Sequence, residues 1–472
     1  MRTVVIDPVT RIEGHAKITI QLDDHGQVAD TSFHVTQLRG FEKFTEGRPF
    51  YEMPNITARI CGICPISHLI ASTKACDAIM SVRIPPTAAM LREVMHCAQI
   101  LQSHALSFFY LSAPDLLLGF ESDPATRNVV GVIEKFPQLA RDGIALRKFG
   151  QQTIAVLAKE RVHPSWAVPG GVNTPLESAA LDRILAELPQ AKAIAVRTLD
   201  FFKTILDRFN EEVATFGNAP TIYAGLVDAD DNIQMYDGGM RFVDASGNVL
   251  VDRMAAPAYA SFIGEATVPY SFLKAPYFKP LGYPEGIYRV GPLARLNVIA
   301  RCGTPTADAA FAEYRQRLGK VVQSSFHFHY ARLIEAIYCL ERMEVLLNDP
   351  AILGRHIRAR AGVNALEGIG MAEAPRGTLI HHYKVNEDGA IIWANLIIAT
   401  GQNNLAIGRS IGQVSRHYIN GKKIDEGVLN RVSAVVRAYD PCLSCSTHAD
   451  GQYALDIRLL DADGSELDRV CN

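Results

Sequence analysis

Two short stretches near opposite ends of the chain, ARICGICPISH at residues 58–68 and DPCLSCSTH at residues 440–448, share one pattern. Each holds two cysteines that are separated by two residues and followed by a histidine, His68 in the first and His448 in the second. This spacing lets two thiolates converge on one ion, and four thiolates suit a soft metal such as zinc, nickel or iron. A single pair, taken alone, is about as often explained by two buried cysteines or by a redox pair as by a metal site.

The separation of the two pairs along the sequence indicates what kind of fold can use them. Cys442 stands 378 positions after Cys64, whereas a structural zinc ribbon closes its ligand set within a few tens of residues. If both pairs bind one metal, the two ends of the chain must meet in the middle of the fold. We therefore expect a buried catalytic site rather than a structural staple. The remaining cysteines are scattered, and we expect each to be a small core or surface residue: Cys76, Cys97, Cys302, Cys339 and Cys471.

Composition is that of a large globular protein. The 472 residues are 48% hydrophobic and 21% charged, and the 47 basic and 50 acidic residues give a formal net charge of −3. Such a balance gives no sign of a nucleic-acid or membrane-surface partner. The mean hydropathy of +0.06 is slightly apolar, which either a large partner interface or a big core would explain.

The N-terminal sequence MRTVVIDPVTRIEGH has neither the apolar core of a signal peptide nor a twin-arginine pattern. No stretch approaches the roughly 18 uninterrupted apolar residues of a transmembrane helix, so no membrane span is expected. We therefore expect a cytoplasmic protein. In that reducing compartment, its nine cysteines are more often ligands or catalysts than disulfide partners.

Hydrophobic periodicity predicts a predominantly helical α+β fold. Apolar residues at helical spacing predict four helical stretches, the third of them long and almost free of helix breakers: 86–118, 181–213, 306–348 and 428–439. Alternating patterns around polar turns predict β-hairpins or strands and turns in three regions: 16–36, 221–251 and 378–400. We expect a central bundle of long helices with peripheral β-hairpins, and an active site buried where the N- and C-terminal motifs meet.

Taken together, the motifs resemble a known family. The two cysteine stretches are similar to the two signature motifs of the large subunit of NiFe-hydrogenases. The resemblance covers essentially the whole chain, through five further segments: RIEGH (11–15), RGFEKFTEGRPF (39–50), SHALSFFYLSAPD (103–115), EAPRGTL (373–379) and NLIIATGQNN (395–404). The segments RGFEKFTEGRPFYEMP and YRVGPLARLN look closest to the cytoplasmic, bidirectional, NAD-linked group.

The resemblance assigns a role to each motif cysteine. It implies that Cys61 and Cys442 are terminal nickel ligands, and that Cys64 and Cys445 bridge nickel to an iron that carries CO and cyanide. The implied activity is the reversible, heterolytic cleavage of H2, with the Cys442 thiolate as first proton acceptor. Glu13 would take the proton next, because a carboxylic acid in a partly dry site can have its pKa raised towards neutrality. Without the resemblance, Glu13 would be read as a surface or capping carboxylate.

An arginine is also implied at the metal site. Arg376 would lie over the open metal position, where its permanently charged guanidinium offers hydrogen-bond donors. Asp115 and Asp440 would hold that guanidinium in place. Structural ion pairs are the plain alternative for all three residues, and that role is compatible with a catalytic one.

The iron pocket and its surroundings are assigned in the same way. Ile398, Ala399 and Thr400 would line the iron pocket, with the Thr400 hydroxyl donating to a cyanide. Family members often have proline and serine in the last two places, so Ala399 departs from the pattern. His68 would donate a hydrogen bond to a bridging sulfur and tune the metal. His104 has the plain alternative of a packed histidine with a satisfied partner.

A third metal site follows from the same resemblance. Glu42, His448 and the backbone carbonyl of Leu396 would hold a magnesium-like ion. Oxygen ligands suit Mg²⁺, whereas an imidazole ligand is less usual for it.

Features that the sequence lacks predict its partners. The stretch GIGMAE at 368–373 fails as a dinucleotide fingerprint, and no cysteine cluster remains for an iron–sulfur cluster. We therefore expect the chain to dock on an iron–sulfur small subunit. If a pyridine nucleotide is the acceptor, we also expect diaphorase subunits that bind flavin and NAD.

The resemblance also implies processing of the chain. It predicts nickel-insertion proteins and a protease that cuts after His448. The chain would then divide into a mature domain, 1–448, and a C-terminal extension, 449–472, that is removed on maturation.

Two other classes of protein compete with this interpretation. A non-catalytic relative, like the large subunits of respiratory complexes, would generally lack the complete set of four cysteines. A zinc-stabilised interaction protein would bind zinc alone, and the long separation of the cysteine pairs argues against it.

Overall fold

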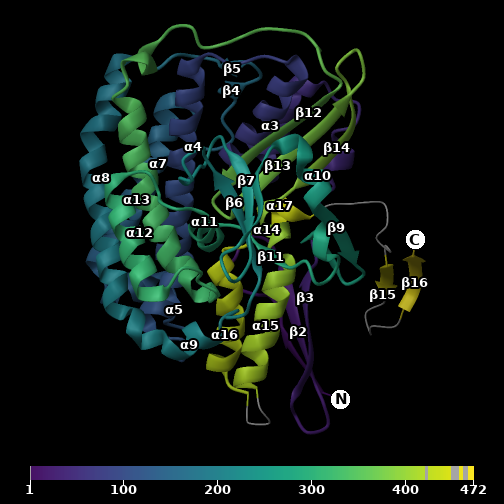
Figure 1. Ribbon diagram of the computed structural model, residues 1–472. Helices are drawn as coiled ribbons and strands as arrows, with labels where there is room; N and C mark the ends of the chain where they lie inside the picture. The colour runs from purple at the N-terminus through teal and green to yellow at the C-terminus, as the bar shows by residue number, and fades with distance from the viewer. Residues whose placement is uncertain (1, 420–423, 448–455, 461–465, 472) are drawn as a thin grey trace.

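The computed structural model describes residues 2–419, 424–447, 456–460 and 466–471 (Figure 1). Long helices occupy one side of the molecule and the main sheets the other, as Figure 1 shows. The helices that pack on one another are α4 (Pro86–Leu106), α7 (Pro137–Ala158), α8 (Ser178–Ile205), α12 (Pro305–Leu318) and α13 (Phe328–Leu347). The predicted α+β class, with helices predominant, is confirmed.

Apolar spacing explains why these segments form a bundle. In α8, Ile184, Leu188 and Ala191 are buried at intervals of four and three residues, so one face of the helix turns to its neighbours. α13 is buried along most of its length because it lies against α4, α8 and α12. None of the helices in the described part of the chain is both long and apolar enough to cross a membrane.

Three predicted helical stretches are interrupted. The stretch 181–213 passes from α8 through a 3₁₀ turn (Leu206–Phe209) into α9 (Asn210–Thr215). The stretch 86–118 is helical throughout, but it passes from α4 through a π-helical segment (Ser107–Ser112) into α5 (Ala113–Leu118). The single long helix predicted over 306–348 is wrong, because α12 ends at Leu318 and α13 begins at Phe328. Gly319 follows α12 with φ of +92°, a backbone conformation that ends a helix and that glycine adopts without strain.

Three sheets carry most of the strands. β1 (Arg2–Ile6), β2 (Ala16–Leu22) and β3 (Val28–Val35) form an antiparallel sheet that contains the predicted N-terminal hairpin. The second sheet has the order β11-β6-β7-β8, with β6 (Ile222–Val227), β7 (Gly239–Val243), β8 (Val249–Met254) and β11 (Tyr288–Arg289). Its first three strands in chain order confirm the strands predicted over 221–251.

The third sheet is largely buried and packs on α3 (Pro65–Met80), the helix that follows the first cysteine pair. It contains β12 (Glu367–Ala374), β13 (Gly377–Val385) and β14 (Ile391–Ile397), of which the last two form the predicted hairpin. β12 was not predicted, because its glycines hide the strand pattern. A Cβ on Gly370 would lie 2.0 Å from the Ala71 carbonyl oxygen of α3, so only glycine permits this approach.

The C-terminal end of the described chain runs back into the core. α16 (Glu426–Tyr439), the last predicted helix, leads into the short helix α17 (Leu443–Ser446). Further on, β15 (Asp456–Leu460) and β16 (Glu466–Cys471) pair as a hairpin that Figure 1 draws to one side of the molecule. Residues 461–465, which connect these two strands in sequence, lie outside the described part of the chain.

Candidate metal centre

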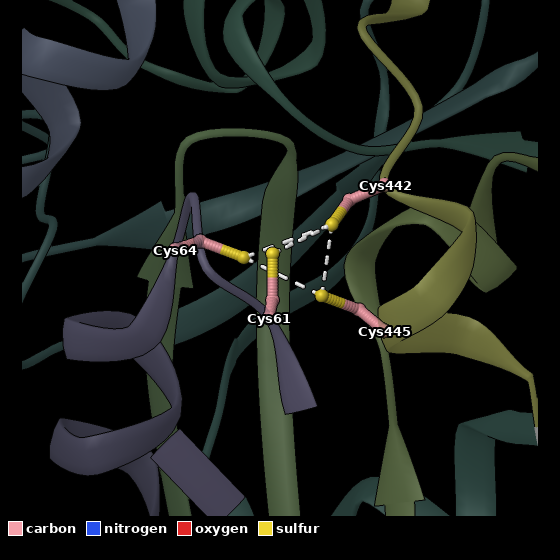
Figure 2. Close-up of side chains that lie close together, drawn as sticks. All are labelled: Cys61, Cys64, Cys442 and Cys445. Carbon is pink, nitrogen blue, oxygen red and sulfur yellow. Dashed lines mark hydrogen bonds between the residues drawn. The ribbon is translucent and has the colours of Figure 1, made fainter. Parts of the chain in front are cut away.

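Four cysteines from the two ends of the chain meet in one buried cluster, with their sulfurs turned toward one another (Figure 2). Their Sγ atoms all lie within 4.8 Å of one another. Cys442 Sγ is 3.1 Å from Cys61 Sγ and 2.9 Å from Cys445 Sγ, and Cys64 Sγ is 3.5 Å from Cys445 Sγ. These separations exceed the ~2.05 Å of a disulfide bond, and all four cysteines are free. The prediction that both pairs meet in one buried site is confirmed.

The first pair lies in the loop between a 3₁₀ turn (Ala58–Ile60) and α3. The Ile63 backbone N–H donates to Cys61 Sγ over 3.2 Å. The Ile63 carbonyl accepts from the side-chain amides of Gln99 and Gln102 on α4, at 2.7 and 2.9 Å. Two neighbouring helices therefore fix this half of the cluster.

The second pair is held by segments that are far away in sequence. The Cys442 N–H donates to Thr400 Oγ1 over 2.9 Å, and the Leu443 N–H donates to the Glu13 carbonyl over 3.1 Å. The Ser444 N–H donates to the Glu13 carboxylate, also over 3.1 Å. Gly14 has φ of +85°, and a Cβ there would lie 2.8 Å from Leu443 Cβ, so the N-terminal loop needs glycine at this point.

The protonation of the cluster reflects its burial. Burial raises the pKa of the Cys442 and Cys445 thiols, whereas hydrogen bonds from Cys442, then Cys445 and Cys64, lower the pKa of Cys61 well below its usual value. Of these three thiols, Cys61 therefore loses its proton most readily. Binding of a metal ion to all four must release protons.

Arg376 lies in the turn between β12 and β13, with its guanidinium buried near the sulfurs. Its Nη2 donates to Asp440 Oδ1 over 3.0 Å, its Nε donates to the Asp440 carbonyl, and its Nη1 reaches Ser103 Oγ over 3.4 Å. Burial alone would lower the pKa of Arg376, but the charges of Asp440 and of the cysteine thiolates outweigh it and raise the pKa. A fixed positive charge therefore faces the cluster, with Asp440 as its predicted anchor.

The predicted contact of Asp115 with Arg376 is wrong. Asp115 instead accepts hydrogen bonds from Arg11 Nη2 over 2.5 Å and from Arg437 Nη1 over 2.6 Å. It stands in the first turn of α5, where the guanidinium groups of Arg11 and of Arg437 on α16 both reach its carboxylate. Asp115 therefore ties the N-terminal segment to α16 and does not touch the metal site.

The other residues predicted around the cluster are all buried. Ile398 and Ala399 stand where β14 leads into α14 (Ala399–Gln402), directly before Thr400. His68 Nδ1 lies 3.2 Å from His381 Nε2, so its hydrogen bond to a sulfur stays a prediction. His104 Nε2 lies 2.7 Å from Glu335 Oε2, which makes it a packed histidine with a partner.

Glu42 is buried beside an ammonium group that no sequence motif indicated. Lys274 Nζ lies 3.4 Å from both carboxylate oxygens of Glu42, and it also approaches Asn395 Oδ1 at 3.3 Å and Glu265 Oε1 at 3.5 Å. Glu42 Oε1 accepts from the backbone N–H of Leu396 over 2.7 Å. His448, the third predicted ligand of this site, lies outside the described residues.

Comparison with known proteins places the chain in a family. Residues 39–121 and 228–448 match the family described as nickel-dependent hydrogenase, and residues 3–38 match a family described as HoxL-like. The chain belongs to the nickel-dependent hydrogenase family. It is a large, catalytic subunit of a NiFe-hydrogenase, and four buried thiols that converge on one point fit such a soft metal centre.

Two relatives and one solved structure show how far the similarity extends. The beta subunit of the NAD-reducing hydrogenase HoxS of Cupriavidus necator is 40% identical, over 99% of each chain. A chain of the F420-non-reducing hydrogenase of Methanothermobacter thermautotrophicus is 41% identical, over 100% of each chain. A crystal structure of an NAD⁺-reducing NiFe-hydrogenase in the H2-reduced state has a TM-score of 0.92 and 43% identity, covering 95% of this chain and 100% of that one.

Proposed function

We propose that this hydrogenase chain works in the cytoplasm and passes the electrons of H2 to NAD⁺ through two partners, an iron–sulfur small subunit followed by a flavin-bearing diaphorase. The observation that carries the metal chemistry is the convergence of Cys61, Cys64, Cys442 and Cys445 beside the buried guanidinium of Arg376. NAD⁺ as acceptor is supported by the similarity to the Cupriavidus necator protein and to the NAD⁺-reducing structure. The F420-non-reducing relative is as similar in sequence, so the acceptor needs its own test.

The four thiolates would hold nickel and iron, with CO and cyanide on the iron. When bound, the nickel–iron centre supplies the heterolytic cleavage of hydrogen. The Thr400 oxygen accepts from the Cys442 N–H, which leaves the hydroxyl proton for a cyanide nitrogen. Ile398 and Ala399 would form the dry wall of that pocket.

Two charged residues would take part in the reaction: Glu13 would transfer the proton, and Arg376 would lie at the open metal position. The Ser444 N–H fixes one carboxylate oxygen of Glu13 beside the second cysteine pair, and the other oxygen has no partner among the described residues. That oxygen can take a proton from Cys442 and release it outward. Arg376 would present its guanidinium to the open position, oriented by Asp440.

We further propose that Glu42, the Leu396 carbonyl and His448 hold a magnesium-like ion. A buried carboxylate suits such an ion, but the Lys274 ammonium lies against the same two oxygens. Because a divalent cation and an ammonium group repel each other, ion binding requires Lys274 to turn toward Glu265 and Asn395. Both of these already lie within 3.5 Å of its Nζ.

Maturation is proposed to follow the domain division at His448. Nickel-insertion proteins would load the site, and a protease would then remove residues 449–472. Thr447, the last described residue before the proposed cut, pairs with Leu273 on β10 (Ser271–Phe278), the strand that also carries Lys274. The intact mass of the active subunit tests this proposal: a C-terminus at His448 supports it, and an active subunit that keeps 449–472 contradicts it.

The function is tested on the chain purified together with its partner subunits. We expect nickel and iron in the preparation, infrared bands of CO and cyanide, and H2-dependent reduction of both a viologen dye and NAD⁺. Zinc alone, or no metal, would contradict the catalytic assignment. Viologen reduction without NAD⁺ reduction by the complete complex would contradict only the acceptor.

A further inference from the structure

A second arginine, Arg295 on α11 (Pro292–Val298), is 0% exposed, and all five of its N–H donors have a partner. Nε and Nη2 bind the two oxygens of the Glu335 carboxylate, each over 2.6 Å. Nη1 donates to Glu373 Oε2 over 2.6 Å and to the Ala374 carbonyl over 3.0 Å, and Nη2 donates to the Pro375 carbonyl over 3.3 Å. Three of the five bonds therefore end on the segment that directly precedes Arg376.

The backbone of Arg376 is held from the same helix. Gly291, which precedes α11, has φ of +95°, and a Cβ there would lie 2.7 Å from the Arg376 carbonyl oxygen. Asn403 Nδ2 donates to that oxygen over 3.4 Å. Arg295 thus holds the residues that precede Arg376, and close packing against Gly291 holds the Arg376 backbone itself.

The guanidinium of Arg376 is also linked to Arg295, through Glu335 and helix α4. Glu335 Oε2, which accepts from Arg295, also lies 2.7 Å from His104 Nε2 on α4. The residue before His104 is Ser103, whose Oγ accepts from Arg376 Nη1 over 3.4 Å. The Arg295–Glu335 pair therefore touches both the segment that leads to Arg376 and the helix that Arg376 reaches with its guanidinium.

We propose that Arg295 is a positioning residue for Arg376, acting through the Glu373–Pro375 segment and through Glu335, so that the guanidinium stays at a fixed distance from the nickel–iron site. This inference rests on the proposed function of Arg376. A planar fork with five fixed donors is required, because a single ammonium group cannot reach two carboxylates and two carbonyls on three elements at once. A role in holding the fold alone would not need three bonds to the short segment, Glu373–Pro375, that leads directly to Arg376.

The control is Arg92 on α4, which has a similar environment away from the site. It is also 0% exposed and pairs with Asp77 over 2.6 Å, and it donates to the carbonyls of Gly171 and Val168. It has no bond to the β12–β13 turn or to the cysteines among the described residues. A loss that comes only from a weakened buried ion pair should therefore be equal in Arg92→Lys and Arg295→Lys.

The test compares Arg295→Lys, Arg376→Lys and the double variant in the assembled enzyme. We expect Arg295→Lys to keep nickel and iron but to lose about 10- to 100-fold in turnover per nickel, as removal of a residue that orients a metal site does. The cyanide bands in the infrared should shift in the same direction as in Arg376→Lys. The double variant should be no slower than Arg376→Lys, because both changes disturb one group.

Arg92→Lys should leave the bands unmoved, and its effect should multiply with that of Arg376→Lys. The proposal is overturned if Arg295→Lys keeps the parent bands and turnover, or if its loss multiplies with that of Arg376→Lys. Should Arg295→Lys not fold, Glu335→Gln, which keeps the volume and one acceptor, must show the same band shift. A parent enzyme without nickel or H2 turnover would instead contradict the proposed function itself.

Hydrogen exchange gives a readout that needs no metal. In the metal-free protein, amides in residues 373–377 should exchange faster in Arg295→Lys than in the parent, whereas Arg92→Lys should leave them unchanged. Equal exchange in all three proteins would contradict the role of Arg295 in holding the turn.

Discussion

The two cysteine pairs share one sequence pattern but are held in different ways. The carbonyl between Cys61 and Cys64 is bound by Gln99 and Gln102, which lie 36 and 39 positions further along the chain. The backbone after Cys442 is bound by Glu13, which lies 431 positions from Ser444. The first pair therefore needs only two neighbouring helices, whereas the second needs both ends of the chain in place.

This difference teaches how the site can be assembled. Contacts between distant segments form only after the entropy of closing a long loop has been overcome. The first half of the site can thus be formed while the second is still open. We expect metal to enter from the side of the second pair, and changes there to have effects that equivalent changes at the first pair do not.

Loss of a cysteine ligand should have the largest effect on activity of all the changes considered, and the effect should be the same at the first pair and at the second. Cys61→Ser and Cys445→Ser should each lose nickel and all measurable H2 turnover, since a hydroxyl is a poor ligand for a soft metal. Metal analysis and H2 uptake measure this result. Cys302→Ala, in a buried cysteine away from the cluster, should keep both. Nickel at parent level in either serine variant would contradict the assignment of the site.

Two substitutions of Glu13 should distinguish its structural role, which is to hold the second cysteine pair, from its role in proton transfer. Glu13→Gln keeps an oxygen for the Ser444 N–H, so nickel should stay bound. An amide cannot relay a proton, and exchange between H2 and solvent deuterons should therefore fall about 100- to 10,000-fold. Glu13→Ala removes both roles and should lose nickel as well. A glutamine variant that exchanges at the parent rate would point to another route for protons.

The contact between Lys274 and Glu42 lies close to Thr447, which follows the second cysteine pair, and it can be tested by substitution. Lys274→Met leaves the buried Glu42 carboxylate without this ammonium, which should cost roughly 3 kcal/mol of stability in urea unfolding. Added Mg²⁺ should restore much of that loss by taking the place of the missing charge. Lys279→Met, at an exposed lysine nearby that donates to the Ala260 carbonyl, is the control and should change nothing. Unchanged stability of Lys274→Met without Mg²⁺ would show that this contact has no energetic weight.

Acid should lower the free energy of unfolding gradually, because the core contains buried neutral histidines. Burial lowers the pKa of His329 on α13 to about 3, against about 6.5 in an unfolded chain, so the folded protein keeps it neutral. Its contribution to stability is complete above pH 6.5 and is lost as the pH falls toward 3, with about 2 kcal/mol lost by pH 5. His329→Phe should flatten the pH dependence of urea unfolding in this window. The same slope in variant and parent would exclude His329 as its source.

The sequence allowed the meeting of the four cysteines to be predicted, because the spacing within each pair is local and four donors that share one metal must converge. Other contacts depend on packing. Asp115 was paired with the wrong arginine, since its partners, Arg11 and Arg437, come from segments that only the tertiary fold brings to it. Lys274, Gln99 and Gln102 were missed because they stand in no motif.

Some missed features did leave a signal. Arg295 is a charged residue within the apolar segment GPLARLN, and a buried charge needs partners, so its position already indicated an ion-pair cluster. Gly319 indicated the break between α12 and α13. The glycines of β12 reveal their purpose only when α3 is seen against them.

The β-bridge between Glu13 and Cys442 joins a segment that the ribosome makes early with one that it makes more than 400 residues later, as the numbers 13 and 442 show. A polypeptide that is released early by the ribosome lacks Cys442 and Cys445 and has no complete pocket, however well its helices have folded. A metal that needs all four thiolates can therefore be bound only after translation has passed Cys445.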